Sequence, residues 1–303
     1  MSATFPWLHC KNCVNFSFKI VSGLWHGNRS IRRLCELNIE QTRIWQDLQK
    51  IRATQPVVHN ITNYVVMNNT ANALLALGAS PVMAHALEEV SDMVAIASAL
   101  VINIGTLSRN WVDAMAQAMR AAHRKGIPII LDPVGAGATA YRTWTARNLA
   151  AMAPPAIIRG NASEIMAMAD SDVRTKGVDS LAASAHALDT AVQLSVELGS
   201  VICISGEIDY IVQGERVIQV ENGHPLMPKV TGLGCTATAL CGAFAAVDED
   251  RAVAAVSAMA VMGIAGERAG ENCPGPGSFQ VRFLDALYNL SETDMMRVRL
   301  KEE

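Results

Sequence analysis

Two hydrophobic patterns alternate along most of this chain. Short runs that are apolar throughout predict buried strands, and longer segments with an apolar residue every three or four positions predict helices. Strands of this kind are expected at 56–62, 80–83, 99–105, 128–132, 156–159 and 201–205, with a hairpin at 210–212 and 216–220. Helices are expected at 39–53, 65–77, 86–97, 109–125, 139–152, 180–198, 252–265 and 279–290. Continuously apolar strands separated by helices indicate an α/β fold with a mostly parallel central sheet and helices on both faces.

The segment 1–35 does not follow this pattern. It carries five basic residues and no acidic ones, and it lacks the apolar core and small-residue cleavage site of a secretory signal. We interpret it as an N-terminal extension, either a disordered arm or a start-site artefact, ahead of a single domain at 36–303. His9, Cys10 and Cys13 resemble half of a zinc site, but no second pair follows at a usable spacing.

The most informative local stretch is 230–240, where two glycines flank Leu233 and an apolar, small-residue helix follows. The helix is expected to begin near Gly234 and Cys235, with its unpaired N–H groups and positive dipole end facing outward. Such a helix start binds anions, and phosphate above all. The same dipole would lower the pKa of the Cys235 thiol. The competing interpretation is a tight turn into a core helix with an inert cysteine.

Other polar residues stand where predicted strands end, which is where open α/β sheets bind their ligands. Asp132 and Glu164 are carboxylates of the kind that Mg²⁺ takes at phosphoryl-transfer sites, and Arg159 can pair with a phosphate. Each residue also has a purely structural interpretation: Glu164 as a helix cap with Asn161, Asp132 as a turn former, and Arg159 in solvent or in a structural pair. The chain contains no P-loop motif and no dinucleotide-binding glycine motif.

Composition narrows the classes of function. The formal net charge is −3, which argues against a nucleic-acid partner. The apolar runs look too short or too interrupted to span a bilayer, so we expect no membrane partner, and the longest of them, 252–265, is expected to be a helix buried in a core or a subunit interface. Seven cysteines without regular spacing favour a reducing, cytoplasmic setting over a disulfide framework.

Ten motifs between about 45 and 290 together resemble the hydroxyethylthiazole kinase family. They are HNITN (59–63), AN (71–72) with LLALGASPVM (74–83), INIGT (102–106), LDPVG (131–135), RGNASE (159–164), KGVDS (176–180), SGEIDY (205–210), NGHPLM (222–227), KVTGLGC (229–235) and GPGSF (275–279).

This resemblance implies a ribokinase-like fold and phosphorylation by ATP, with Mg²⁺, of the hydroxyl of 4-methyl-5-(2-hydroxyethyl)thiazole for thiamin salvage. It also implies a homotrimer with the thiazole bound at subunit interfaces. On the matching positions, the resemblance assigns Met83 and Gly232 to the thiazole, and Arg159 and Ser205 to ATP. It assigns Asp132 and Glu164 to the metal and the phosphates. It places Cys235 at the catalytic position, where most ribokinase-like enzymes have an aspartate. Gly234 and Cys235, at the predicted helix start, would form the anion hole.

Two positions depart from the family pattern. Ser205 stands where the family often has Thr, so the hydroxyl is kept, and Leu233 is larger than the usual residue there, so it either narrows the anion loop or points into the core. Our hypothesis for Cys235 is that it orients the substrate hydroxyl, and accepts its proton late if at all, without a covalent intermediate. A pyrimidine alcohol kinase of the same fold and a non-catalytic thiazole- or nucleotide-binding regulator are the alternatives.

Overall fold

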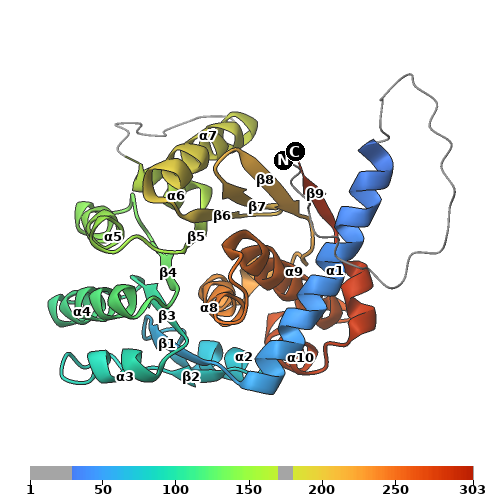
Figure 1. Cartoon of the computed structure of the whole chain (residues 1–303). Coiled ribbons are helices and arrows are strands. Elements are labelled where there is room, and N and C mark those ends of the chain that lie inside the picture. Colours follow the sequence, from blue (N-terminus) through green and yellow to red (C-terminus); the bar gives the residue numbers. More distant parts are fainter. Residues whose placement is uncertain (1–28, 170–179, 303) are drawn as a thin grey trace, which may run out of the picture.

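The computed structural model of the protein describes residues 29–169 and 180–302. Within these residues, a single sheet of nine strands runs through the molecule in the order β2-β1-β3-β4-β5-β6-β7-β8-β9 (Figure 1). The strands are β1 (Val57–Ile61), β2 (Ser80–Val82), β3 (Ala99–Asn103), β4 (Ile129–Asp132), β5 (Ile157–Asn161), β6 (Val201–Ser205), β7 (Asp209–Gln213), β8 (Arg216–Val220) and β9 (Leu300–Glu302). The strands β1 to β6 all pair in parallel, and β7, β8 and β9 extend the sheet in antiparallel pairing. The predicted mostly parallel sheet is confirmed.

Helices cover both faces of this sheet, as predicted (Figure 1). One face carries α3 (Val90–Ile96), α4 (Arg109–Lys125), α5 (Ala140–Met152), α6 (Ala162–Met168) and α7 (Ser180–Leu198). The other carries α1 (Arg29–Thr54), α2 (Met67–Leu77), α8 (Leu233–Ala245), α9 (Arg251–Gly270) and α10 (Pro276–Tyr288). The short 3-10 turns η1 (Met227–Lys229) and η2 (Glu292–Arg297) complete the described elements.

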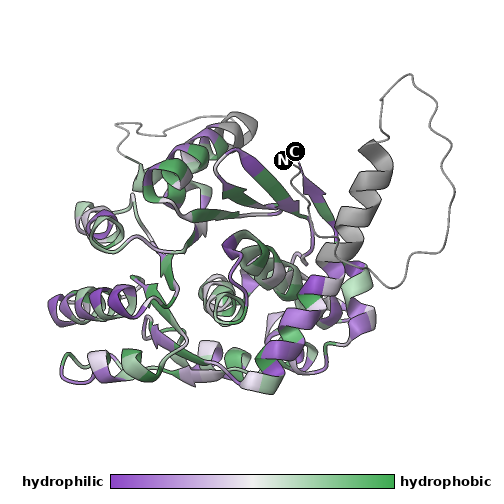
Figure 2. Ribbon diagram, in the orientation of Figure 1, coloured by the Kyte–Doolittle hydropathy of each residue, from purple (hydrophilic) through white to green (hydrophobic). Residues whose placement is uncertain are grey.

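Alternation along the strands divides the core into two clusters. On β3, Val101 packs with the α8 side while Leu100 and Ile102 pack with the α4 side. Successive side chains of a strand point to opposite faces, so a strand buried on both faces must be apolar throughout. This is why the uninterrupted apolar runs identified the strands, which are largely green at the centre of the sheet in Figure 2.

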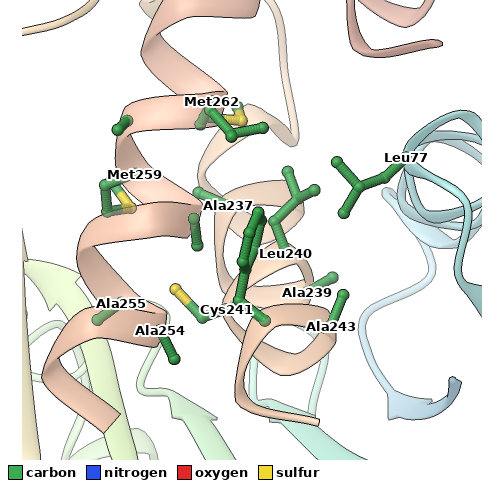
Figure 3. Packing of buried hydrophobic residues seen from close by; sticks show 14 of the residues in the cluster. Leu77, Ala237, Ala239, Leu240, Cys241, Ala243, Ala254, Ala255, Met259 and Met262 are labelled. Carbon is green, nitrogen blue, oxygen red and sulfur yellow. The ribbon is translucent and has the colours of Figure 1, made fainter. Parts of the chain in front are cut away.

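The α8 and α9 pair forms the inner layer on one face, and its contacts are built from small residues. Ala237 and Cys241 of α8 lie on the side that faces α9, near Ala254 of that helix, and Leu240 points toward Leu77 of α2 (Figure 3). Short side chains let the two helix backbones approach closely, and dense packing of this kind tolerates little added volume. The two helices therefore hold the loop between β8 and α8 against a rigid support.

The helix α9 corrects one expectation drawn from composition. By length and mean hydropathy (1.3 over its best window) it is apolar enough to cross a membrane, so the apolar run is longer than we had judged. However, 83% of that window is buried inside the protein, as in the core helix of a globular protein. The prediction that this segment is a buried helix is confirmed.

Several boundaries differ from the sequence predictions. The helix expected at 86–97 begins only at Val90, with Glu89 as its N-cap. The helix expected at 65–77 begins at Met67, and its N-cap Val66 forms no side-chain hydrogen bond. The strand β9, of three residues, and the turn η2, of six, were not predicted, because elements this short give no periodic signal.

Three sequence features lie outside the described residues or at their edge. The half zinc site at His9, Cys10 and Cys13 lies outside them, and so does most of the motif at 176–180. The helix α1 begins at Arg29, ten residues before the predicted start, so it crosses the expected boundary between the extension and the domain. That boundary at 35 stays a prediction.

Candidate active site

The carboxyl ends of five parallel strands meet the start of α8 at one edge of the sheet. The register places Asn103 of β3 beside Asp132 of β4, and Asn161 of β5 beside Ser205 of β6. In such sheets the crevice beyond the strand ends is the ligand-binding position. The register therefore gathers residues that are far apart in the sequence into one site.

The start of α8 depends on its two glycines. Gly232 is the N-cap with φ +85°, a left-handed conformation, and a Cβ there would lie 2.6 Å from Val66. A Cβ on Gly234 would lie 2.9 Å from Nη1 of Arg159, so the missing side chain lets the guanidinium approach the helix start. Leu233 is 8% exposed and packs in the core, which decides between the two interpretations of its side chain. Its bulk does not obstruct the turn, and the helix N–H groups remain available for an anion.

A chain of hydrogen bonds links Cys235 to Asp132. Asn63 Nδ2 donates to Cys235 Sγ (3.4 Å) and to Asn103 Oδ1 (2.8 Å). Asn103 Nδ2 in turn donates to Asp132 Oδ2 (2.8 Å), which also accepts from the Thr238 hydroxyl at 2.8 Å. The other carboxylate oxygen, Oδ1 of Asp132, is buried without a partner among the described residues. A buried acceptor left free in this way points to a group that binds here.

Burial sets the protonation of these two residues. It raises the pKa of Asp132 to about 6, although Arg159, Thr238 and Asn103 stabilise the carboxylate. Burial also raises the pKa of Cys235 to about 11, and the nearby Asp132 charge adds to the effect. The expected lowering of the Cys235 pKa is therefore wrong. Desolvation and a neighbouring carboxylate outweigh the helix dipole, and the thiol is protonated at neutral pH.

The two residues assigned to ATP lie side by side. Arg159 Nη2 donates to Ser205 Oγ at 2.6 Å, and the Ser205 hydroxyl donates to the Gly160 carbonyl at 3.3 Å. Arg159 Nε has no partner among the described residues, so the guanidinium is not saturated. Asp209, at the start of β7, lines the same cavity, and burial raises its pKa to about 6.

Glu164 has the structural role that the sequence offered as its alternative. It forms a capping box with Asn161, whose side chain accepts from the Glu164 N–H at 3.0 Å. Its Oε2 accepts from the Asn161 N–H at 2.9 Å, and its Oε1 accepts from the Gly135 N–H at 2.8 Å. Both carboxylate oxygens thus hold backbone, tying the loop after β4 to the start of α6. A metal role for Glu164 stays a prediction.

A cavity of about 810 Å³ opens beside this centre. Its lining combines Arg159 and Ser205 with the start of α8 at 231–234, the loop 221–228, and Met259, Met262 and Gly263 of α9. A cavity with apolar walls and a cationic, N–H-lined end suits a ligand that has both an apolar ring and an anionic group. Gly232 and Gly234 belong to this lining, whereas Met83 does not.

Met83 lies elsewhere along the same sheet edge. It follows β2, is partly buried, and its carbonyl is 3.3 Å from Nδ1 of His85. Nearby, the rings of Tyr64, His85 and Trp111 pack together, with the Tyr64 side chain 65% exposed. No contact joins Met83 to Cys235 in the described chain, so its role toward a substrate stays a prediction.

Three residues that organise the centre, Asn63, Asn103 and Thr238, received no role in the site from the sequence alone. The position of Asn63 before a predicted helix is typical of a cap, and Thr238 stands within the predicted small-residue helix. A usable signal existed for Asn103, since a polar residue closes an otherwise apolar strand. Among the described residues no group of three or more His, Cys, Asp or Glu side chains stands ready to hold a metal ion.

Comparison with known proteins places this geometry in a family. The chain matches the hydroxyethylthiazole kinase family over residues 48–293. It is 60% identical over 262 residues to the hydroxyethylthiazole kinase of Syntrophus aciditrophicus, covering 86% of this chain and 97% of that one. It is 54% identical to the hydroxyethylthiazole kinase of Desulfotalea psychrophila, covering 85% and 94%.

Solved structures agree with the sequence match. The hydroxyethylthiazole kinase of Pyrococcus horikoshii superposes with a TM-score of 0.79 at 41% identity, covering 86% of this chain and 99% of that one. The pyridoxal kinase of Staphylococcus aureus, solved in complex with AMP-PCP, superposes with a TM-score of 0.59 at 14% identity over 82% of this chain and 98% of that one, which supports the fold alone. The predicted ribokinase-like fold is confirmed, and the chain belongs to the hydroxyethylthiazole kinase family.

Proposed function

We propose that this protein transfers the γ-phosphoryl group of ATP to the hydroxyl of 4-methyl-5-(2-hydroxyethyl)thiazole, as a step of thiamin salvage. Membership of the family and the names of its relatives support this activity. The observation that carries the proposal concerns the start of α8. An anion-binding helix start with a nearby arginine lies there beside a buried centre made of a carboxylate and a thiol. Arg159 lies against Gly234, and Cys235 and Asp132 are linked through Asn63 and Asn103.

In this proposal ATP lies in the cavity with its phosphates toward Arg159. The phosphates belong at the start of α8, where N–H groups and the positive dipole end favour an anion, and Arg159 adds a charge there. The base then extends along the cavity toward the apolar wall that includes Met259 and Met262. Phosphoryl transfer is mostly a matter of positioning and of stabilising charge, which this arrangement supplies without a P-loop.

Asp132 is the residue we assign to Mg²⁺. Its Oδ1 is a buried acceptor without a partner, and Mg²⁺ at such sites takes one or two carboxylates and keeps several waters. When bound, Mg²⁺ would neutralise charge on the phosphates. Glu164 fits a direct ligand less well, because both of its oxygens already accept backbone N–H groups. We therefore assign Glu164 to holding the loop after β4 in place.

Cys235 orients the acceptor hydroxyl in this proposal. With a pKa of about 11 the thiol is protonated at neutral pH, so it donates a hydrogen bond and takes no proton from the substrate. Its sulfur already accepts from Asn63, which directs the S–H away from that side. A loose transition state needs little help from a base, so an orienting group suffices.

The thiazole itself is assigned to Met83 and Gly232. Met83 lies at the outer edge of the sheet, away from the cavity, so one protomer gives the ring only part of an enclosure. A homotrimer with sites at subunit interfaces, as proposed from the resemblance, would supply the remainder.

Free thiols at Cys203, Cys235, Cys241 and Cys273 support a reducing compartment such as the cytoplasm.

The test is ATP turnover with hydroxyethylthiazole, measured as ADP and thiazole phosphate, with and without Mg²⁺. A pyrimidine alcohol is assayed beside it at the same concentrations. We expect Mg²⁺-dependent phosphate transfer to the thiazole alcohol and little transfer to the pyrimidine.

Two results would overturn the assignment. A preference for the pyrimidine alcohol would make this a different kinase of the same fold. If the thiazole raises the melting temperature while ATP is never consumed, the protein is a binding regulator.

A further inference from the structure

The segment 221–228, between β8 and η1, forms one wall of the cavity that we assign to ATP. Residues 221–226 belong to no helix or strand, and the 3-10 helix η1 begins at Met227. A loop without ladder hydrogen bonds holds its shape only if other parts of the protein fix it. What fixes this wall lies on α9 and in the C-terminal segment.

One face of α9 is made of glycines where the wall crosses it. Gly263, Gly266 and Gly270 follow one another at spacings of three and four, so they share a helix face. A Cβ on Gly263 would lie 2.5 Å from Asn222, and a Cβ on Gly266 would lie 2.5 Å from Met227. The segment therefore lies directly on the helix backbone. The close fit holds it from one side.

Asn222 also fixes the wall by hydrogen bonds, both to α9 and to the C-terminal segment, and its side chain is saturated. Nδ2 donates to Glu267 Oε1 at 3.0 Å and to the Arg297 carbonyl at 2.9 Å. Oδ1 accepts from the Arg299 N–H at 2.9 Å. The residue is 4% exposed, so water does not replace these bonds if they are lost.

Glu267 and Arg299 close the connection. Glu267 Oε1 accepts from the Gly223 N–H at 3.1 Å and from Arg299 Nη2 at 2.6 Å. Arg299 Nη2 also donates to the Glu221 carbonyl at 2.6 Å, and the Arg299 carbonyl accepts from the Glu221 N–H at 2.9 Å. Three successive wall residues, 221 to 223, are thus held by one acid of α9 and one arginine of the C-terminal segment.

The C-terminal segment is itself anchored. β9 pairs with β8, with Leu300 opposite Val220, immediately before the wall. On the preceding turn, Asp294 forms a salt bridge with Arg268 of α9 at 3.0 Å. The segment is therefore a fixed part of the fold that reaches the ATP cavity only through the wall.

We propose that Asn222, together with Glu267 and Arg299, is a positioning group for the nucleotide: the C-terminal segment sets ATP affinity by holding the 221–228 wall. This inference rests on the proposed function only in taking ATP as the ligand of the cavity. The group lies beside the β6–β8 half of the site, away from the Asp132–Cys235 centre. Loss of these hydrogen bonds, which we call the brace, therefore weakens ATP binding and leaves the rate of the chemical step and the thiazole affinity unchanged.

The experiment compares Asn222→Ala and Arg299→Met with the unaltered full chain. We expect Asn222→Ala to raise the dissociation constant of ATP, measured by calorimetry on the free enzyme, about tenfold, equivalent to about 1.4 kcal/mol. The side chain of Arg299 is 48% exposed, so its replacement leaves folding intact, and we expect a rise of about threefold. The KM for ATP should rise more in Asn222→Ala than in Arg299→Met. In both variants, kcat and the KM for the thiazole alcohol should stay within about twofold of the values of the unaltered chain.

Arg297→Met is the matched control. It removes an arginine of the same segment with 43% side-chain exposure, whose guanidinium pairs with Glu271 and does not touch the wall. Its ATP affinity should equal that of the unaltered chain. Because Asn222 and Arg299 share Glu267, the double variant should lose less than the product of the two single effects.

Unchanged ATP affinity in both Asn222→Ala and Arg299→Met would overturn the proposal, and so would equal losses for ATP and thiazole, which would indicate general loosening of the fold. Should Asn222→Ala not fold, the comparison of Arg299→Met with Arg297→Met decides. If the unaltered chain binds ATP but phosphorylates no thiazole alcohol, the proposed function fails, and the calorimetric comparison still tests the brace.

Discussion

The two ends of this site are constructed differently. At the acceptor end, side chains from β3, β4, α8 and the loop after β1 hydrogen-bond to one another and leave one carboxylate oxygen free. At the nucleotide end, a single loop lies on a glycine face of α9, and Asn222 of this loop fixes it by hydrogen bonds to Glu267 and to the C-terminal segment. The first depends on the register of parallel strands, and the second depends on an antiparallel extension and a short tail.

This difference separates the kinetic parameters that each end controls. Groups at the acceptor end contact the reacting atoms in our proposal, so their loss should lower kcat. Groups at the nucleotide end shape a binding surface, so their loss should raise the KM for ATP.

The largest expected effect is on kcat in Asp132→Asn. The amide keeps the shape of the side chain but removes the charge at the point where Mg²⁺ and phosphate meet. We expect kcat to fall by about 10³-fold, with the KM for ATP changed far less. Steady-state assays at saturating Mg²⁺ measure both constants. A comparable rise in the KM for ATP would mean that Asp132 acts at the nucleotide end as well.

The stability of the same variant provides its control. The pKa of Asp132 is raised from 3.8 to about 6 by folding, so the native state binds more protons than the unfolded state between these values. The cost of the buried charge is absent below pH 4 and reaches its full value above pH 6. Relative to Asp132→Asn, the unaltered chain should gain stability as the pH falls from 8 to 5, measured by urea unfolding.

The second effect is the slow alkylation of Cys235. Its pKa of about 11, against 9.0 for an unperturbed thiol, leaves about 100-fold less thiolate at pH 8. Iodoacetamide labelling followed by peptide mass spectrometry should show slow modification, and Asp132→Asn should accelerate it by removing a charge that raises the pKa. Rapid labelling would instead indicate a reactive thiolate, as expected if the helix dipole outweighed burial and lowered the pKa of Cys235.

A third, smaller effect is expected in Cys235→Ala. If the thiol only orients the hydroxyl, kcat should fall by about 10- to 100-fold while the dissociation constant of ATP stays the same. Intact mass measured during turnover should show no phosphorylated enzyme. A phosphorylated cysteine would replace the orienting role with a covalent one.

The smallest effect tests the nucleotide end with a matched pair at position 205. Ser205→Ala removes the hydroxyl that accepts from Arg159 at 2.6 Å, and we expect a rise in the KM for ATP of about fivefold with kcat nearly unchanged. Ser205→Thr keeps the hydroxyl, so its KM should stay within about twofold. A fall in kcat with either variant would mean that the nucleotide end also affects the chemical step.

The acceptor end was only half visible in the sequence. Asp132 stood out because a carboxylate follows an apolar run, and Cys235 stood out because it follows a glycine turn at the start of a helix. The role of Asn63 was missed, because a polar residue before a helix looks like a cap, and here its Oδ1 does accept the Val65 N–H at 3.1 Å. Its amide hydrogens reach Asn103 and Cys235, residues 40 and 172 positions away. No local pattern reports a contact over that separation.

The sequence by itself determined the layered α/β fold, because a strand covered on both faces must be apolar throughout and a covered helix must repeat every three to four residues. It also determined the turn at 232–234, since glycines there permit a left-handed residue and the close approach of Arg159. Only the tertiary structure decided the protonation of Cys235, because burial and Asp132 act through space against the local helix dipole. It alone decided, too, that Glu164 holds backbone with both oxygens and that residues near the C-terminus support the cavity wall, since both depend on which distant backbone the fold brings within reach.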